Sequence, residues 1–378
     1  MKMIKFLSLS LLVVTMGCKQ QVPVTSGIEK KSFGKLADGT ETYLYTLTNT
    51  QGVSVSVTNY GGRITSVNVP DKNGALGDIV LGFDSVAGYI ADNTSQGSLV
   101  GRYANRISKG QFVIDDNAYT LACNNAPNHL HGGVVGFDRK IWNVKEITDS
   151  SQVGLELSYT SVSGEEGYPG NLSVIVIYSL SNESNELKIE YWAETDTPTI
   201  VNLTNHAYYN LSAGADKTIL NHLLLIPADS ITPVDSTLIP TGKLAAVEGT
   251  PFDFRKLIRI GSRIEVSDQQ LSFGKGYDHN FALNNNGNLA LAAEVVDSLS
   301  GRVLQVYTTK PGIQFYSGNF LDGTFTGKDG TFHSYRYALC LEPQHFPDSP
   351  NKPQFVSPVL RPGEKYHQVD VYKFSVLP

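Results

Sequence analysis

The chain has 378 residues, of which 41% are hydrophobic and 17% are charged, a composition typical of a folded soluble core and not of a disordered segment. The formal net charge of −6 disfavours nucleic acid as a partner, because phosphate binding needs a basic surface. The 35 Gly and 17 Pro residues indicate many turns.

Residues 1–17 have the pattern of a secretory signal. Lys2 and Lys5 precede an apolar run over 6–14 that is too short to cross a membrane. A small residue and Cys18 follow, as in a bacterial lipoprotein signal in which Cys18 becomes the lipidated first residue. Cleavage by the general signal peptidase, without lipidation, is the alternative. Either way we expect an exported protein, periplasmic or anchored to a membrane through Cys18.

Residues 18–27 are polar and are expected to act as a tether, with one domain over 28–378. Two further cysteines, Cys123 and Cys340, do not make a disulfide framework, and we predict two free thiols. No Cys/His spacing matches a zinc site, and no phosphate-binding loop is found in the sequence.

From residue 28 onward the pattern predicts short strands separated by turns. Apolar and polar residues alternate over 53–58, 153–159 and 187–192. Residues 172–178 are more continuously apolar, as in a strand that is buried on both faces.

Residues 111–121 predict a hairpin that turns at 115–117. Helical periodicity is limited to short pieces near 85–93 and 262–271. The predicted fold class is therefore all-β, as one large, mostly antiparallel β-sandwich.

Polar clusters interrupt this pattern, and the first lies over 101–110. Asn105 and Arg106 suit a ligand rich in hydroxyls, because a guanidinium presents several donors in a fixed fork. A structural arginine that ties a loop to backbone carbonyls is an equally good interpretation.

The second cluster, over 124–133, contains His129 and His131. On an extended chain these two residues share a face, which suits a metal, but no third ligand is evident nearby. We therefore interpret His131 as a donor to a ligand and His129 as a residue that holds the loop.

The third cluster, over 200–211, places Asn202, Thr204 and His206 on one face of a strand. Such a face is either a structural hydrogen-bond network or a wet cleft. His206 favours the cleft, because an unperturbed pKa of about 6.5 lets histidine exchange a proton near neutrality.

Two later segments add acceptors. Asp278 lies between glycines and a strand, where it either accepts from two vicinal hydroxyls or caps a turn. Alternation over 313–317 turns Gln314 and Tyr316 away from the apolar neighbours, so Gln314 is predicted to line a cleft.

The last cluster begins as an apolar strand at residue 337. Ala338, Cys340 and Glu342 share one face, and Pro343 is expected to end the strand directly after Glu342. The two small side chains predict a cleft floor beside the carboxylate. On this stretch alone, an exposed carboxylate at a strand end is the simpler interpretation. Together the clusters suit a neutral, polyhydroxylated ligand and need no metal or cofactor.

Five segments in this order resemble motifs of the aldose 1-epimerases, or galactose mutarotases: 101–110, 128–133, 202–208, 276–281 and 341–346. Residues 164–170 resemble a further family segment. The resemblance covers nearly the whole chain after the tether. It implies an open sugar cleft on a mutarotase-like β-sandwich, and interconversion of the α and β anomers of free aldohexoses such as glucose and galactose.

By this resemblance Glu342 is the general base and His206 the general acid. These roles require an ionised Glu342 and a charged His206 in the free enzyme, which reference pKa values of about 4.3 and 6.5 permit, and a nearby Asp278 is expected to keep His206 protonated. The motif positions also imply sugar contacts from Asn105, Arg106, His131, Asp278, Gln314, Tyr208 and Tyr168.

Other classes stay open at this point. A glycoside hydrolase or lyase on a similar sandwich would use Asp278 and Glu342 as its carboxylate pair. A carbohydrate-binding module would have the polar cleft without the chemistry. A relative that acts on sugar phosphates is a third alternative, although an exported protein would rarely meet such substrates.

Overall fold

The structure is a computed structural model and describes residues 24–377. Its largest layer is an antiparallel nine-stranded sheet, whose strands lie in the order β11 (Asn143–Thr148), β12 (Gln152–Ser161), β13 (Leu172–Ser181), β14 (Glu186–Thr195), β28 (Tyr366–Val376), β24 (Arg302–Thr308), β23 (Ala290–Val296), β18 (Leu223–Leu225) and β21 (Ile258–Arg259).

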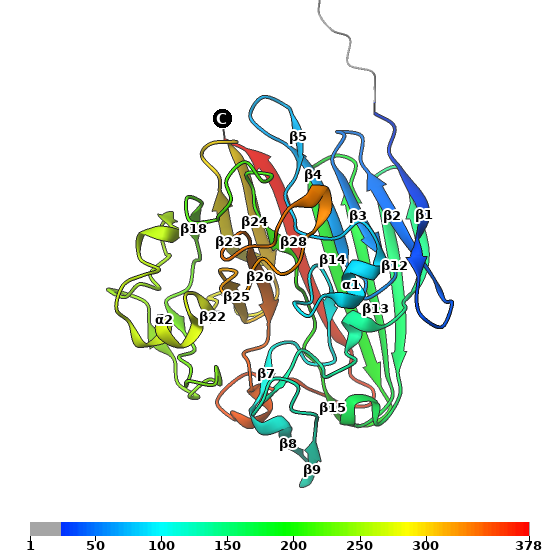
Figure 1. Ribbon diagram of the computed structural model, residues 1–378. Helices are drawn as coiled ribbons and strands as arrows, with labels where there is room; N and C mark the ends of the chain where they lie inside the picture. The colour runs from blue at the N-terminus through cyan, green and yellow to red at the C-terminus, as the bar shows by residue number, and fades with distance from the viewer. Residues whose placement is uncertain (1–23, 378) are drawn as a thin grey trace, which may run out of the picture.

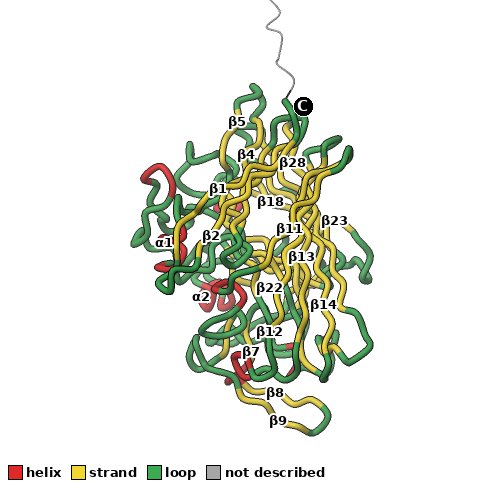
Figure 2. Tube along the Cα trace, turned by 90° about the vertical axis from the view of Figure 1, so that its right-hand side faces the viewer, coloured by secondary structure: helices red, strands yellow, loops and turns green. Residues whose placement is uncertain are grey.

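A second, five-stranded antiparallel sheet contains the N-terminal strands, in the order β1 (Gly27–Lys35), β2 (Glu41–Thr48), β3 (Ser54–Thr58), β4 (Ile64–Pro70) and β5 (Leu76–Asp78). It lies against the larger sheet, as Figures 1 and 2 show. The inward side chains of both sheets, such as Val55 and Leu157, belong to one buried apolar cluster. This cluster is the core of a β-sandwich, and burying it is the main favourable contribution to folding.

A third, six-stranded sheet contains parts of several of the polar segments singled out in the sequence. Its order is β17 (Tyr208–Tyr209), β26 (Leu339–Gln344), β25 (Gly312–Tyr316), β22 (Asp278–Ala282), β19 (Ser230–Ile231) and β20 (Ala245–Ala246). In β25 and β26, Gln314 pairs with Glu342, and in β22 and β25, Asn280 pairs with Gln314. Segments far apart in the sequence are thus fixed side by side by backbone hydrogen bonds.

Four two-stranded ladders connect these layers: β6 (Leu99–Val100) with β16 (Thr204–Asn205), β7 (Arg106–Ile107) with β10 (His129–Leu130), β8 (Gln111–Ile114) with β9 (Asn117–Thr120), and β15 (Thr199–Ile200) with β27 (Val359–Leu360). The β8–β9 hairpin projects from one end of the molecule (Figure 2). In the part of the chain that the structure describes, helix is confined to α1 (Val86–Ala91), α2 (Gln269–Gly274) and 3-10 turns at Ser108–Gly110, Phe137–Arg139, Glu165–Gly167, Ile260–Ser262, Lys328–Gly330 and Ser349–Asn351.

The predicted all-β, mostly antiparallel sandwich is confirmed, and so are the hairpin and the alternating strands, which correspond to β3, β12 and β14. Both helical pieces exist, but α2 covers only the end of its predicted range. Cys123 and Cys340 are free, as predicted. Within residues 24–377, none of the helices has the length and apolar character needed to cross a membrane. The expected signal peptide and Cys18 lie outside the described residues.

Two expectations about strands were wrong. Strand β13 is not buried on both faces: Val174 and Val176 point into the core, whereas Ile175 is 39% exposed on the outer face of the sheet. Strand β26 does not stop at Glu342 but continues through Pro343 to Gln344. Proline is tolerated there because β17 pairs only with Leu339 and Cys340, so β26 has a hydrogen-bonded neighbour on one side only at Pro343.

Candidate active site

A cavity of about 300 Å³ lies where β7, β10, β22 and β26 meet. Seven of the predicted site residues line it: Asn105, Arg106, His131, His206, Tyr208, Asp278 and Glu342. They come from five segments of the chain that are well separated in sequence: 105–106, 131, 206–208, 278 and 342. The fold therefore brings most of the polar clusters to one place.

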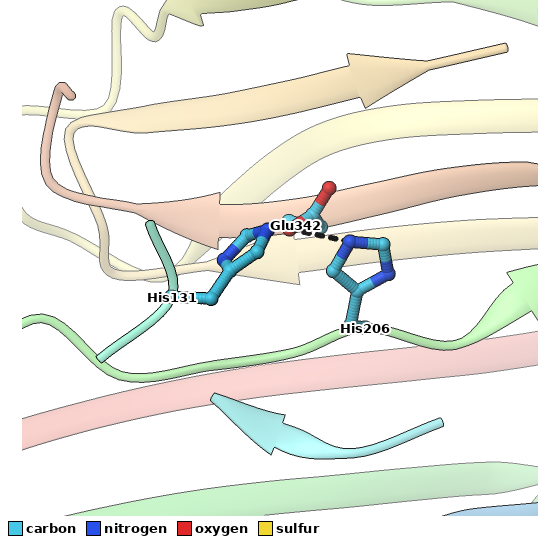
Figure 3. Close-up of side chains that lie close together, drawn as sticks. All are labelled: His131, His206 and Glu342. Carbon is cyan, nitrogen blue, oxygen red and sulfur yellow. Dashed lines mark ion pairs between the residues drawn. The ribbon is translucent and has the colours of Figure 1, made fainter. Parts of the chain in front are cut away.

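His206 and Glu342 form the centre of this cavity. Nε2 of His206 lies 3.6 Å from Oε2 of Glu342, and the two residues are only 5% and 2% exposed. Glu342 is held by the pairing of β26 with β25, and His206 by backbone hydrogen bonds with Gly97 and Ser98. Figure 3 shows the side chains of His131, His206 and Glu342 converging, with the contact between His206 and Glu342 dashed.

Three neighbours fix the orientation of the His206 ring. It stacks on Tyr208 with ring centroids 5.1 Å apart, and the His131 ring meets it edge-on at 5.2 Å. Its Nδ1 lies 3.5 Å from Sγ of Cys340. Tyr208 is itself anchored, because its hydroxyl donates to the Thr94 carbonyl over 3.2 Å. The ring thus presents Nε2 to Glu342.

His131 is positioned as a neutral donor. Its Nδ1 accepts from the backbone N–H of Asn105 at 3.2 Å, which leaves the ring proton on Nε2. Burial, together with the charges of His206 and Arg106, holds the pKa of His131 well below its usual value. His131 is therefore suited to donate a hydrogen bond to a ligand oxygen, and its role toward a sugar stays a prediction.

The expectation that His129 and His131 share a face was wrong. His131 has a left-handed φ of +51°, which breaks the alternation of an extended chain. His129 instead points away from the cavity: Nδ1 bonds the Ala122 carbonyl at 2.8 Å and Nε2 accepts from the Tyr168 hydroxyl at 2.6 Å. His129 holds the loop, as predicted.

Two predicted sugar-binding residues do not line the cavity. Tyr168 is buried beneath the loop, where its hydroxyl bonds His129 and its ring lies near Phe112. Gln314 lies behind Asp278, and its Nε2 donates to Oδ1 of Asp278 over 2.7 Å. Gln344 in turn donates to Oε1 of Gln314 over 3.1 Å. In this arrangement Gln314 holds the Asp278 carboxylate in position.

Cys340 and Ala338 were expected to form the cleft floor, but neither residue lines the cavity. Both are fully buried with Tyr208 and Tyr316 in a small apolar cluster. The ring of His206 lines the cavity at this point, and its Nδ1 contacts the Cys340 thiol behind it. The thiol lies one layer beneath the cavity wall.

Several lining residues were not predicted: Asn93, Thr94, Ser95, Asn125, Leu130, Tyr316 and Phe320. Asn125 lies in the polar cluster over 124–133 and Tyr316 in the alternating segment over 313–317, so the sequence carried a signal for both. Residues 93–95 and Phe320 lie in loops without polar periodicity. Phe320 is 45% exposed at the cavity and stacks on Tyr316 with centroids 6.0 Å apart.

Burial controls the charges of the central pair. It raises the pKa of Glu342 well above its usual value, and the negative charge of Asp278 adds to this while Arg106 opposes it. Burial also lowers the pKa of His206 to about 4. Both shifts favour uncharged forms, so within the pair the proton resides on Glu342 and His206 is neutral. The expectation of an ionised Glu342 and a charged His206 in the free enzyme was wrong. It relied on reference pKa values, which apply to groups in water and not to buried side chains.

The side-chain atoms of His131, His206 and Glu342 that could bind a metal ion all lie within 4.8 Å of one another. The separate motifs did not reveal this grouping. Arg106 lines the same cavity, and its charge acts on Glu342, Asp278 and His131. A fixed positive charge disfavours a second cation nearby. The arrangement is better suited to proton exchange with a hydroxylated ligand.

Comparison with known proteins agrees with this geometry. A family model described as aldose 1-epimerase matches residues 43–373. The galactose mutarotase of Mus musculus is 44% identical over 349 residues, which is 92% of this chain and 99% of the mouse protein. The aldose 1-epimerase of Escherichia coli K12 is 39% identical over 340 residues, which is 89% of this chain and 96% of that protein.

Solved structures give the same result. The galactose 1-epimerase of Lactobacillus acidophilus superposes with a TM-score of 0.82 at 30% identity, covering 93% of this chain and 99% of that chain. An aldose epimerase homologue from C. elegans gives 0.81 at 32% identity, covering 94% and 100%. Fold, site and sequence agree: this chain belongs to the aldose 1-epimerase family.

Proposed function

We propose that this isomerase interconverts the anomers of free aldohexoses by exchanging protons between the sugar and the pair Glu342 and His206. The observation that carries the proposal is the 3.6 Å separation of His206 Nε2 and Glu342 Oε2 in a buried cavity lined by hydroxyl-binding groups. Aldose anomer interconversion is the reaction of the family, and the relatives named above support galactose as one substrate.

In the forward half of the reaction, Glu342 takes the proton of the C1 hydroxyl. His206 donates the proton on Nε2 to the ring oxygen O5, the C1–O5 bond breaks, and C1 becomes an aldehyde. Rotation about C1–C2 exposes the other carbonyl face. The O5 hydroxyl then attacks that face, its proton returns to His206, and Glu342 returns its proton to O1. General acid–base assistance of this kind contributes about 10²–10⁴-fold.

The buried setting favours the ring-opening step. Ring opening places a proton on Glu342 and removes one from His206, so an ionised pair becomes neutral. Burial stabilises both neutral forms, which is what the raised pKa of Glu342 and the lowered pKa of His206 express. Ionising the buried pair is unfavourable and takes place before the chemical step. Hydrogen bonds from the bound sugar must therefore stabilise the ionised forms of Glu342 and His206.

The other cavity residues have roles that follow from their chemistry. Arg106 and the Nε2–H of His131 are donors for sugar oxygens that gain negative charge during proton transfer. Asp278 is an acceptor for sugar hydroxyls, and Asn105 offers its side-chain amide. Holding the sugar in line with the pair lowers the entropy cost of the reaction.

Polarimetry on freshly dissolved α-glucose or α-galactose tests this proposal directly. The wild-type protein should speed the change in optical rotation and release no new reducing ends. Glu342→Gln and His206→Asn should each keep the circular dichroism spectrum of the fold and lose most of that rate. Full activity in both variants would refute the assignment of the pair.

We also propose that the protein is exported and, with Cys18 lipidated, attached to a membrane. The support is the sequence pattern of residues 1–18. Labelling of cells with a radioactive fatty acid tests it: the wild-type protein should carry label and Cys18→Ser should not. Absence of label in the wild type, with a shortened soluble product, would instead indicate cleavage by the general signal peptidase.

A further inference from the structure

Two side chains of one strand bracket the imidazole of His206. Cys340 and Glu342 are two residues apart in β26 and therefore point to the same side of it. Oε2 of Glu342 lies 3.6 Å from Nε2 of His206, and Sγ of Cys340 lies 3.5 Å from Nδ1. Each ring nitrogen thus has its own partner, one on the cavity side and one on the buried side.

The partner at Nδ1 matters because His206 must lose and regain a proton at one defined nitrogen. After donating the Nε2 proton to the sugar, a neutral His206 is productive only if its remaining proton is on Nδ1. Nε2 is then bare and can take the proton back. The tautomer of a neutral histidine is set by the hydrogen bond that its other nitrogen makes.

Cys340 has the chemistry to hold that proton. A thiol sulfur is a weak acceptor as well as a weak donor. The side chain is fully buried, and burial with the nearby charges of Glu342 and Asp278 raises the pKa of its thiol well above the usual value. Cys340 therefore stays an uncharged thiol, and it adds no negative charge next to His206.

We infer that Cys340 is a positioning residue whose sulfur accepts the Nδ1–H of His206, so that Nε2 remains the nitrogen that exchanges protons throughout turnover. The inference rests on the proposed function of His206. A carboxylate at this position would also select the tautomer, but it would favour the charged imidazolium. A neutral sulfur selects the tautomer and still lets His206 give its proton away.

The pairing of β26 explains why the sulfur stays in place. Cys340 pairs with Tyr208 in β17 on one side and with Tyr316 in β25 on the other. Tyr208 also stacks on the His206 ring, at an interplanar angle of 24°. The same pairing thus sets the position of the sulfur and the plane of the ring that it contacts.

Nitrogen-15 NMR of the full chain with labelled histidine tests the tautomer without any activity measurement. Neutral His206 in the wild-type protein should show the Nδ1–H form. Cys340→Ala, which removes the sulfur acceptor at Nδ1, should show a mixture or the Nε2–H form. Cys340→Ser, whose hydroxyl accepts, should restore the Nδ1–H form. Assignment of the signal is checked by its loss in His206→Asn.

Activity gives the second readout. Cys340→Ala should lower kcat about fivefold, the effect of losing one ordinary hydrogen bond, with KM nearly unchanged, and Cys340→Ser should recover most of the loss. Cys123→Ser, which changes the exposed thiol, is the matched control and should behave as wild type.

The inference is wrong if wild-type His206 is in the Nε2–H form, or if Cys340→Ala keeps both the tautomer and kcat. A lower melting temperature in Cys340→Ala with an unchanged tautomer would assign Cys340 a packing role only, and would also overturn the inference. If Cys340→Ala does not fold, the wild-type tautomer and the Cys340→Ser variant still decide. Failure of the proposed function is distinguishable, because it would appear as full activity in Glu342→Gln and His206→Asn.

Discussion

Gln314 donates a hydrogen bond from its side-chain amide to Oδ1 of Asp278 over 2.7 Å, and it lies behind that carboxylate, outside the cavity wall. Its own Oε1 is held by Gln344 over 3.1 Å. Asp278 is therefore the end of a buried amide chain that crosses three neighbouring strands, β22, β25 and β26. A carboxylate fixed in this way can meet a sugar hydroxyl without first losing side-chain entropy.

This relationship predicts that Gln314→Leu weakens sugar binding through Asp278. A hydrogen bond to a charged group is worth about 1.5–3 kcal/mol, so KM should rise at least about tenfold while kcat falls less. Initial rates from polarimetry over a range of galactose concentrations measure both constants. A loss confined to kcat would show that Gln314 supports the catalytic pair instead.

A double-mutant cycle separates this indirect role from a direct sugar contact. In an Asp278→Asn background, Gln314→Leu should add little to the loss, because its partner has already changed. Two independent, additive effects would instead place Gln314 in contact with the sugar, as the sequence motif alone suggested. Asn125→Ala changes a lining amide of the cavity that does not contact Gln314 and serves as the additive control.

The sequence predicts the fold class well, because alternation over short strands reports burial directly. It places seven cavity residues correctly because they lie in polar segments that interrupt apolar strands. It cannot tell Gln314 from Asp278, because both face one side of the sheet and only the register of β22 with β25 decides which reaches the cavity. It misplaces Tyr168, whose hydroxyl is taken by His129 across a distance in sequence that no local pattern reveals.

The pH dependence of kcat/KM should be bell-shaped, with an acid limb and an alkaline limb that are both set by protonation of the pair His206 and Glu342. The pKa of His206 is lowered to about 4, so below that pH a second proton is added and no base remains. The raised pKa of Glu342 sets the alkaline limb, where the pair loses its only proton. His131, Asp278 and Arg106 line the cavity beside the pair, and the buried charges of Asp92 and Arg63 also act on His206. Tyr208 and Cys340 are uncharged.

Polarimetry from pH 3 to pH 9 in buffers of constant ionic strength measures this profile. An acid limb close to the unperturbed histidine value of about 6.5 would contradict it, because that result means a solvated His206. His131→Asn is the matched control, because it changes a neutral donor. It should lower the rate and leave the pH of the acid limb nearly unchanged.

Gly132→Ala should destabilise the loop that carries His131. Gly132 has a φ of +84°, and a Cβ at this position would lie 1.8 Å from the carbonyl oxygen of Gly101, which is backbone and cannot swing aside. Gly164→Ala is the matched control, because φ is +86° there and nothing lies within 4 Å of the new Cβ. The control should lose about 1 kcal/mol, the cost of a left-handed residue, and Gly132→Ala clearly more.

Urea unfolding followed by fluorescence measures both variants. Because His131 immediately follows the β10 strand and precedes Gly132, the Gly132→Ala protein should also lose activity out of proportion to its stability. Equal free energies of unfolding in the two variants would show that the loop moves to accept the Cβ, contrary to the rigid contact with Gly101.

His279 should make the protein less stable in acid. It is fully buried, its Nδ1 accepts from the Asp278 N–H at 3.2 Å, and burial lowers its pKa to about 3. The unfolded chain has the usual value of about 6.5, so as the pH falls from 6.5 to 3 the unfolded state takes up a proton that the folded state refuses. This histidine alone should therefore cost about 1.4 kcal/mol of unfolding free energy for each pH unit in that window, and nothing above it.

His279→Gln keeps an acceptor and cannot titrate, so its free energy of unfolding should fall less steeply than that of the wild type between pH 6 and pH 4. Urea titrations at those two pH values measure the difference. Parallel losses in the two proteins would mean that His279 is protonated in the folded state, and that solvent reaches a ring that now packs against Phe252.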